Sequence, residues 1–272
     1  MPGPLLPKEL WCETWAELYN GIDEFSGAEP YQWLFRGHRN ASWRLTPRIE
    51  RVCDSSTLLN TELHLFNEFR SKAHLHTQYL PPLEDQVSWL GVMQHYGIPT
   101  RLLDWSYSAY VALFFAVEHT ADDQYGVLWA LHLDTLMKTA RKQTSELFNF
   151  PQNAVLERPD RFGKMAFPPA FHDDESTGLI ASFLPQFHAS RLSSQQGCFL
   201  LNCNYRTTFE SSLAEMMRGE DSAWLYRIVF PQKLRVECLQ RLMSFNIHHA
   251  SLFPDLEGLA KFLTLKIELF PR

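Results

Sequence analysis

An arginine interrupts an apolar run near the start of the chain. Residues 33–51 read WLFRGHRNASWRLTPRIER, and Arg36 follows three apolar residues that are typical of a short buried strand. A guanidinium stays charged at neutral pH, so Arg36 must meet a carboxylate, an anionic ligand or water. Gly37 has no side chain, which allows backbone or a ligand to approach closely. Arg36 is therefore predicted to lie in the floor of a ligand site.

A second group of polar residues precedes an apolar helix in residues 89–118. Its members are Gln94, His95, Arg101, Asp104, Ser106 and Ser108. Taken singly, each has a structural explanation, with Asp104 or Ser106 capping the helix and Arg101 pairing with Asp104. Taken together beside a Pro-Thr turn, these side chains resemble the rim of a pocket.

Two further segments offer polar side chains at the ends of apolar elements. Residues 191–201, RLSSQQGCFLL, open through Gly197 into a strand, and adjacent glutamines there could bind an amide or a base edge or form an ordinary loop. Cys198 lies on that strand and is expected to be inert core. In residues 252–259, LFPDLEGL, Asp255 and Glu257 suit the first turn of a helix and could also partner Arg36 or Arg101.

Several kinds of site are excluded by spacing. The histidines lack HExxH or a similar arrangement with carboxylates, so no metal is expected. Neither GxGxxG nor GxxxxGK[ST] occurs, so a glycine loop that cradles phosphate is also excluded.

Composition favours a reduced, water-soluble protein that binds small ligands or proteins. The 272 residues are 45% hydrophobic and 14% aromatic, and the net charge of -6 provides no basic field for general nucleic-acid binding. The five cysteines are scattered, which is typical of reduced thiols in the cytoplasm. The longest apolar run, residues 109–117, is too short to cross a membrane, and no signal peptide is expected.

Hydrophobic periodicity predicts an α+β fold with a mixed sheet core flanked by helices. Strands are predicted at residues 32–35, 126–133, 197–203 and 223–229. Helices are predicted at residues 14–25, 55–79, 85–96, a stretch ending at 118, 208–217, 231–245 and 254–265. We expect one domain over residues 1–272, with residues 138–182 forming an insertion or lid because their pattern is polar and contains proline.

Five motifs together closely resemble the FRG domain family. They are FRGH at residues 35–38, WRLTPRIER at 43–51, MQHYGIPTRLLDWS at 93–106, SRLSSQQGCF at 190–199 and LFPDLEGL at 252–259. The resemblance covers most of the chain. Family members are mostly uncharacterised bacterial and phage-related proteins, which implies a bacterial toxin or phage-defence setting and leaves the activity open.

A weaker resemblance links the chain to arginine-type ADP-ribosyltransferases. That family has an aromatic-Arg-Gly strand end, then a serine-containing strand before an apolar helix, then a loop with a glutamate that enters another strand. The resemblance implies that Arg36 pairs with the pyrophosphate or ribose of NAD, that Ser106 or Ser108 supports the nicotinamide, and that Gln196 contacts the ribose. A glutamine stands where the family has its glutamate, and an amide cannot supply that negative charge.

The leading hypothesis is an ADP-ribosyltransferase-like enzyme that binds NAD or a related nucleotide. The residues expected in its cleft are Arg36, Gly37, His38, His95, Arg101, Asp104, Ser106 and Gln196, with Arg36, His95 and Gln196 as the candidate catalytic residues. A protein or nucleic acid would be the acceptor. Two alternatives stay open. One is a non-catalytic recognition module in which Arg36, Arg101, Asp104 and Asp255 form a structural ion-pair network. The other is a nuclease or hydrolase that uses His38 or His95 with a nearby acid.

Overall fold

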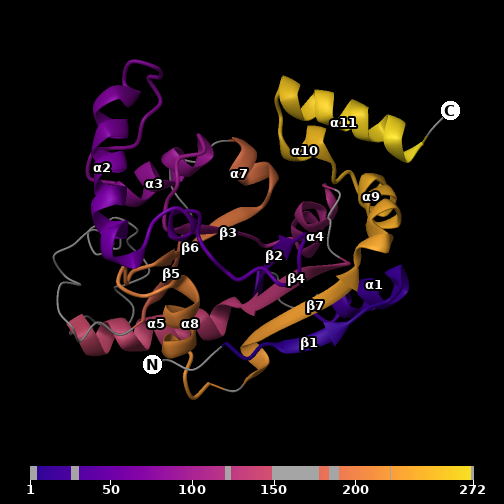
Figure 1. The fold of residues 1–272 in the computed structure, drawn as a ribbon, viewed down its shortest axis with the longest axis horizontal. Helices are drawn as coiled ribbons and strands as arrows, with labels where there is room; N and C mark the ends of the chain where they lie inside the picture. The colour runs from indigo at the N-terminus through magenta and orange to yellow at the C-terminus, as the bar shows by residue number, and fades with distance from the viewer. Residues whose placement is uncertain are drawn as a thin grey trace.

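A seven-stranded sheet forms the centre of the protein. The computed structural model describes residues 5–25, 31–119, 124–148, 178–183, 190–220 and 222–270. The strands are β1 (Lys8–Trp11), β2 (Trp33–His38), β3 (Leu102–Ser106), β4 (Tyr125–His132), β5 (Ile180–Phe183), β6 (Gly197–Asn202) and β7 (Leu225–Pro231). Their order is β1-β7-β4-β2-β3-β6-β5 (Figure 1), with β1 parallel to β7 and the other neighbouring pairs antiparallel. This open mixed sheet confirms the predicted α+β class.

Helices cover both faces of the sheet (Figure 1). They are α1 (Trp15–Asp23), α2 (Ser55–Ala73), α3 (Gln86–His95), α4 (Ala109–Val117), α5 (Leu133–Phe148), α7 (Ser190–Ser194), α8 (Phe209–Met216), α9 (Arg235–Ser244), α10 (His249–Leu252) and α11 (Leu256–Leu269). Three short 3-10 turns complete the described elements: η1 (Ile49–Arg51), η2 (Ser222–Trp224) and η3 (Gln232–Leu234). Two apolar clusters, one on each face, make the core.

Helix α4 lies directly on β2 and explains why residue 37 is a glycine. The helix is apolar all round, as expected for a buried helix, and Ser108 caps it by accepting from the amide of Val111 at 3.3 Å. A Cβ on Gly37 would collide with the backbone carbonyl of Ala112 in α4. Gly37 is therefore required for close approach of a helix backbone, which is one of the two explanations that the sequence offered.

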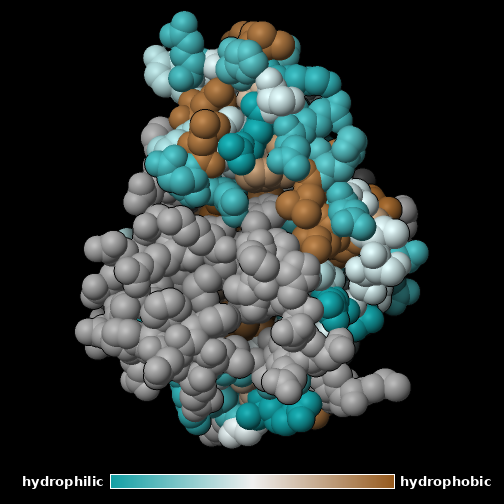
Figure 2. All heavy atoms as spheres, turned by 90° about the vertical axis from the view of Figure 1, so that its left-hand side faces the viewer, coloured by the Kyte–Doolittle hydropathy of each residue, from teal (hydrophilic) through white to brown (hydrophobic). Residues whose placement is uncertain are grey.

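The opposite face is covered by α2, α3, α5 and α8. Buried side chains of these helices, such as Phe66 of α2 and Leu136 of α5, belong to the same apolar cluster as Leu34 and Trp129 of the sheet. On the outer face over α2, apolar and polar side chains are interspersed (Figure 2). Helices α2 and α3 rise above the sheet on one side and α10 and α11 on the other (Figure 1).

Three strands were not predicted. Strand β1 falls in the expected proline-rich leader, β3 in the expected approach to a helix, and β5 at the end of the expected insertion. Helix α5 continues to Phe148, so both ends of residues 138–182 are regular structure. The middle of that span, residues 149–177, lies outside the described residues, and its role as a lid stays a prediction.

The five cysteines are free thiols, and four of them are buried. Cys12 and Cys238 belong to the apolar cluster on the α4 face, whereas Cys198 and Cys203 belong to the cluster on the other face. Burial raises the pKa of Cys198 to about 12, so its thiol is protonated at neutral pH. The expectation that Cys198 is inert core agrees with this placement.

Candidate functional site

A cleft of about 800 Å³ opens above the centre of the sheet. Its floor is made by the ends of β2, β3 and β6, one wall by η1, α3 and residues 77–79, and the other by α7 and the first turns of α11. Five arginine or lysine residues and four acids line it, in a chain whose net charge is -6. The cleft is therefore more positive than the protein as a whole, which favours an anionic ligand.

Arg36 lies in the floor of this cleft, as predicted for it. Its side chain is 19% exposed, and its Nη1 donates to the backbone carbonyl of Asp104 at 2.5 Å. The carboxylate of Asp104 is farther away, 3.9 Å from the same nitrogen, and is 63% exposed. Among the described residues, Nη2 of Arg36 has no hydrogen-bond partner, so this end of the guanidinium is available to a ligand.

Strands β2 and β3 separate where Arg36 meets Asp104. They pair in register only at Phe35 and Ser106. Beyond this point the guanidinium of Arg36 reaches the Asp104 carbonyl and takes the place of a backbone ladder bond. The opening between the two strands thus creates the floor of the cleft and orients Arg36 within it.

His38 holds Arg36 from behind. The imidazole is 6% exposed, and its Nε2 accepts a hydrogen bond from Nε of Arg36 at 3.0 Å. Burial, followed by the charge of Arg36, lowers the pKa of His38 to about 3. His38 is therefore neutral, which it must be in order to accept this bond, and it does not line the cleft.

Trp105 supplies a second donor without a partner. It is 3% exposed and lines the cleft, and its Nε1 has no hydrogen-bond partner among the described residues. Because an unpaired buried N–H is unfavourable, such a group is a candidate to bind a ligand atom.

Ser106 connects the floor to the turn before β6. Its Oγ donates to the carbonyl of Gln195 at 2.8 Å and accepts from the amide of Ser108 at 3.0 Å. The amide of Tyr107 donates to the carbonyl of Gln196 at 2.9 Å. These bonds hold Gln196 at a φ of 45°, a left-handed conformation that is unfavourable for a residue with a side chain.

His95, at the end of α3, faces Arg191 and the start of α11 on the opposite wall. The guanidinium of Arg191 stacks on the ring of Phe253 at 4.2 Å from its centre. Burial and the charge of Arg191 lower the pKa of His95, and Asp255 opposes them. Gln195 Nε2 donates to the carbonyl of Leu252 at 3.2 Å, which fixes α7 against α10.

The comparison with protein families agrees with the motifs in the floor. A family model described as the FRG domain matches residues 31–125. The chain contains an FRG domain. No curated protein and no solved structure matches the chain.

The FRG domain match covers only part of the cleft. Its span includes β2, α3 and β3, and therefore Arg36, His95 and Ser106. The turn before β6 and the start of α11 lie beyond residue 125, although they form the opposite wall. The site is thus completed by chain outside the matched span.

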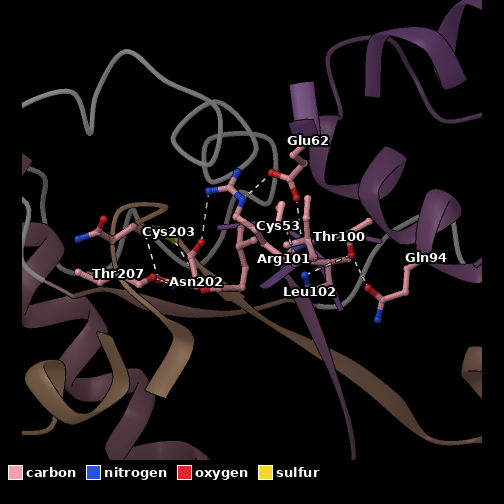
Figure 3. A network of polar contacts seen from close by, with 12 residues as sticks. Cys53, Glu62, Gln94, Thr100, Arg101, Leu102, Asn202, Cys203 and Thr207 are labelled. Atoms are coloured by element: carbon pink, nitrogen blue, oxygen red, sulfur yellow. Dashed lines mark hydrogen bonds and ion pairs between the residues drawn. The ribbon is translucent and has the colours of Figure 1, made fainter. Parts of the chain in front are cut away.

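Arg101 is placed differently from the prediction. It is 1% exposed, and it lies in a buried network instead of in the cleft (Figure 3). Its Nε donates to Glu62 at 2.5 Å, its backbone amide donates to the same carboxylate at 2.9 Å, and Nη1 reaches the carbonyl of Asn202 at 3.4 Å. The predicted role of Arg101 in binding phosphate and its predicted pairing with Asp104 are therefore corrected: its charge is used inside the core.

The predicted place of Gln196 in the cleft is also corrected. It is exposed and absent from the lining of the cleft, whereas its neighbours Gln195 and Gly197 line it. The left-handed turn shifts which glutamine faces inward, so Gln195 replaces Gln196 as the candidate contact. Asp255 caps α11 by accepting from the amide of Gly258 at 2.7 Å and pairs with neither Arg36 nor Arg101.

Three cleft arginines were missed by the sequence analysis. Arg48, Arg51 and Arg191 line the cleft, and the first two lie within WRLTPRIER, only a short distance along the chain from Arg36. Arg48 is positioned by its bond to the carbonyl of Gly97 at 2.6 Å. The clustering of arginines shortly after the FRG motif is the sequence signal that could have identified Arg48 and Arg51.

None of the helices in the described ranges combines the length and apolar character needed to cross a membrane. Within the same ranges, no three or more histidine, cysteine or acidic side chains are grouped so that they could hold a metal ion.

Proposed function

We propose that the cleft binds NAD or a related nucleotide and that the protein is an ADP-ribosyltransferase-like enzyme. The observation that carries this proposal is the meeting of Arg36, Ser106 and the Gln195 turn on three adjacent strands. Phe35 lies opposite Ser106, and Ser106 lies opposite Gly197. These three motifs follow the chain order of the resemblance, and they meet in the floor of one cleft.

The available groups suit a dinucleotide. Arg36 would bind phosphate oxygens through its free Nη2, since a planar guanidinium matches them well. Arg48 and Arg51 add positive charge on the wall that η1 forms, and the cleft volume is in the range of small-molecule sites. NAD as substrate supplies a nicotinamide–ribose bond, which breaks with its electron pair leaving on nicotinamide. An acceptor nucleophile then bonds to the ribose carbon and releases a proton.

Positioning of the nicotinamide and ribose would fall to other residues. Ser106 fixes the turn that presents Gln195, and Gln195 offers an amide to the ribose. His95 is exposed on the wall and would contact the ribose or the acceptor. No glutamate stands in the turn, so an acid for the developing positive charge would come from Asp104, Asp255 or Glu257, which line the cleft.

The first test is a thermal shift measurement with NAD, ADP-ribose and simple nucleotides. A ligand that binds only the folded state raises the free energy of unfolding by mass action, by about 2.7 kcal/mol at a ligand concentration of 100 Kd. The melting temperature rises as a result. We expect a shift with NAD that disappears in Arg36→Lys. Arg241→Lys, on the exposed surface of α9, is the matched control and should keep the shift. Absence of a shift with every nucleotide in the folded wild type would contradict the proposal.

The turn without a glutamate favours a second function, a non-catalytic module that recognises a nucleotide or a protein. Release of nicotinamide separates the two. The enzyme should release nicotinamide from NAD in the presence of an acceptor extract, whereas a recognition module should bind NAD or ADP-ribose and leave the bond intact. A toxin or phage-defence role fits either function and would be tested by expression in a bacterial host.

A further inference from the structure

Helix α11 carries an exposed apolar stripe that the cleft does not use. Its members are Leu256, Leu259, Leu263, Ile267 and Phe270, with Leu256 84% and Ile267 74% exposed. The successive spacings are 3, 4, 4 and 3 residues. At about 100° per residue, the four members within α11 fall within roughly 80° of the circumference of the helix. Phe270 is the C-cap residue directly after it. The four therefore form one continuous line along α11.

The stripe is separate from the face that packs on the protein. Leu265 and Leu269 are buried, and Gly258 allows close contact with the backbone of Phe253. Gly258 and Lys261 line the cleft and lie on the side of the helix away from the stripe. A partner bound to the stripe would therefore leave the cleft open.

The spacing of the stripe is symmetric about Leu263. Leu263 is the centre, Leu259 and Ile267 lie four residues to either side, and Leu256 and Phe270 lie seven to either side. An antiparallel second copy would thus place Leu263 against Leu263, Leu259 against Ile267, and Leu256 against Phe270. A two-fold interface requires this self-complementarity, and the average spacing of 3.5 residues is that of a helix-pairing seam.

We propose that α11 is a homodimer interface in which the helices of two copies pack antiparallel about Leu263. Full burial of the stripe in both copies would remove on the order of 1,000 Å² from water, which is near the lower limit for a specific interface. The dimer is therefore expected to be weak and concentration-dependent. The charged residues of α11 are two acids and two lysines, Glu257, Lys261, Lys266 and Glu268, of which Glu257 and Lys261 pair at 2.7 Å. Helix α11 lacks the basic face of a helix that lies on anionic lipid.

Cysteine cross-linking tests the register directly. In Leu263→Cys, two thiols meet at the two-fold axis, and a mild oxidant such as diamide removes two electrons and two protons to form one intermolecular disulfide. The matched control is Thr264→Cys, which is also exposed but points away from the stripe. We expect covalent dimers from Leu263→Cys and only the wild-type background from Thr264→Cys. Equal cross-linking of the two variants, or none in either, would overturn the proposal.

Sedimentation supplies a readout that does not depend on cysteine. Wild type should shift from monomer towards dimer as its concentration rises, and Thr264→Glu should behave in the same way. Leu263→Glu should stay monomeric while keeping the melting temperature of wild type, since the changed side chain is exposed. A wild type that is monomeric throughout, or a Leu263→Glu that still dimerises, would reject the interface. Flotation of wild type, but not Leu263→Glu, with anionic vesicles would reject it in favour of a membrane surface.

Discussion

Arg36 and Arg101 both lie beside strand β3 and are used in opposite ways. Arg101 directly precedes the strand, is 1% exposed and is neutralised by Glu62. Arg36 reaches the strand at Asp104, is 19% exposed and is held by a neutral imidazole and a backbone carbonyl. Among the described residues, the only carboxylate within 4 Å of the Arg36 guanidinium is that of the exposed Asp104, at 3.9 Å.

The difference separates a structural charge from one that is available to a ligand. A buried guanidinium bound to a carboxylate has its charge compensated inside the protein, and removal of either partner leaves the other uncompensated. Neutral acceptors orient a guanidinium but do not cancel its charge. Arg36 therefore keeps a positive charge directed at the cleft, and four substitutions can test this comparison.

The largest effect on stability is expected from substitution of Arg101. Arg101→Met should lower the free energy of unfolding by about 3 to 5 kcal/mol, because Glu62 is left buried without its partner. The double variant Arg101→Met with Glu62→Leu should regain most of that loss. Urea unfolding of the three proteins measures both values. A loss below about 1 kcal/mol in the single variant would remove the distinction between the two arginines.

Glu50 adds a pH dependence to the buried network. It accepts from the amide of Phe209 at 2.9 Å and hydrogen-bonds Asn202, whose carbonyl is a partner of Arg101. Burial raises the pKa of Glu50 to about 7 from an ordinary value of 4.5. Between these values the folded protein binds more protons than the unfolded chain, so stability is lost as the pH rises through 7.

The expected loss in the free energy of unfolding is about 1 to 2 kcal/mol. It is smaller than the full pKa shift of Glu50 would give, because the side chain is partly exposed to solvent. Glu50→Gln should flatten the dependence. Urea unfolding at a series of pH values checks it, with Glu257→Gln on exposed α11 as the control. An equal slope in wild type and Glu50→Gln would show that the carboxyl is not perturbed.

Arg36→Lys should change stability by less than about 1 kcal/mol, because the lost bonds are to neutral acceptors at a partly exposed site. Its effect should fall on ligand binding, with at least a tenfold weaker Kd, or about 1.4 kcal/mol. Calorimetric titration with the nucleotide identified by thermal shift, together with urea unfolding, measures the two quantities. A variant that unfolds readily and gains nothing from ligand would make Arg36 structural, like Arg101.

The smallest effect is expected for Asp104→Asn. An exposed ion pair at this distance contributes less than about 0.5 kcal/mol to stability. Removal of its negative charge should strengthen the binding of ADP-ribose a few-fold, because Arg36 then has no competing anion. The same titration applies. Weaker binding in Asp104→Asn would indicate that Asp104 contacts the ligand itself.

The sequence predicts the fold class and the residues in the floor of the site better than it predicts which groups pair with the charged side chains. Arg36, Gly37 and Ser106 were identified because each ends or borders an apolar element. Strand β3 was missed, since LLDW leads directly into an apolar helix and carries no turn signal of its own. Periodicity is local, so it indicates elements more readily than the contacts between them.

Long-range pairing explains the remaining errors. Glu62 and Arg101 come from different elements and meet only after α2 packs against the start of β3, so no spacing in the chain joins them. Gln195 was passed over in favour of Gln196 because a single left-handed residue changes which side chain faces the cleft. Both errors concern tertiary geometry that residue types do not encode locally.

The distribution of buried thiols provides a chemical probe of the two layers of the molecule. Cys12 and Cys238 report on the α4 side and Cys198 and Cys203 on the other, and burial holds the pKa of each of the four at about 11 to 12. Only a thiolate is alkylated rapidly, so each should react only when its layer opens. Pulsed alkylation followed by peptide mass spectrometry would then time the opening of each face of the sheet separately, with the partly exposed Cys53 labelled first.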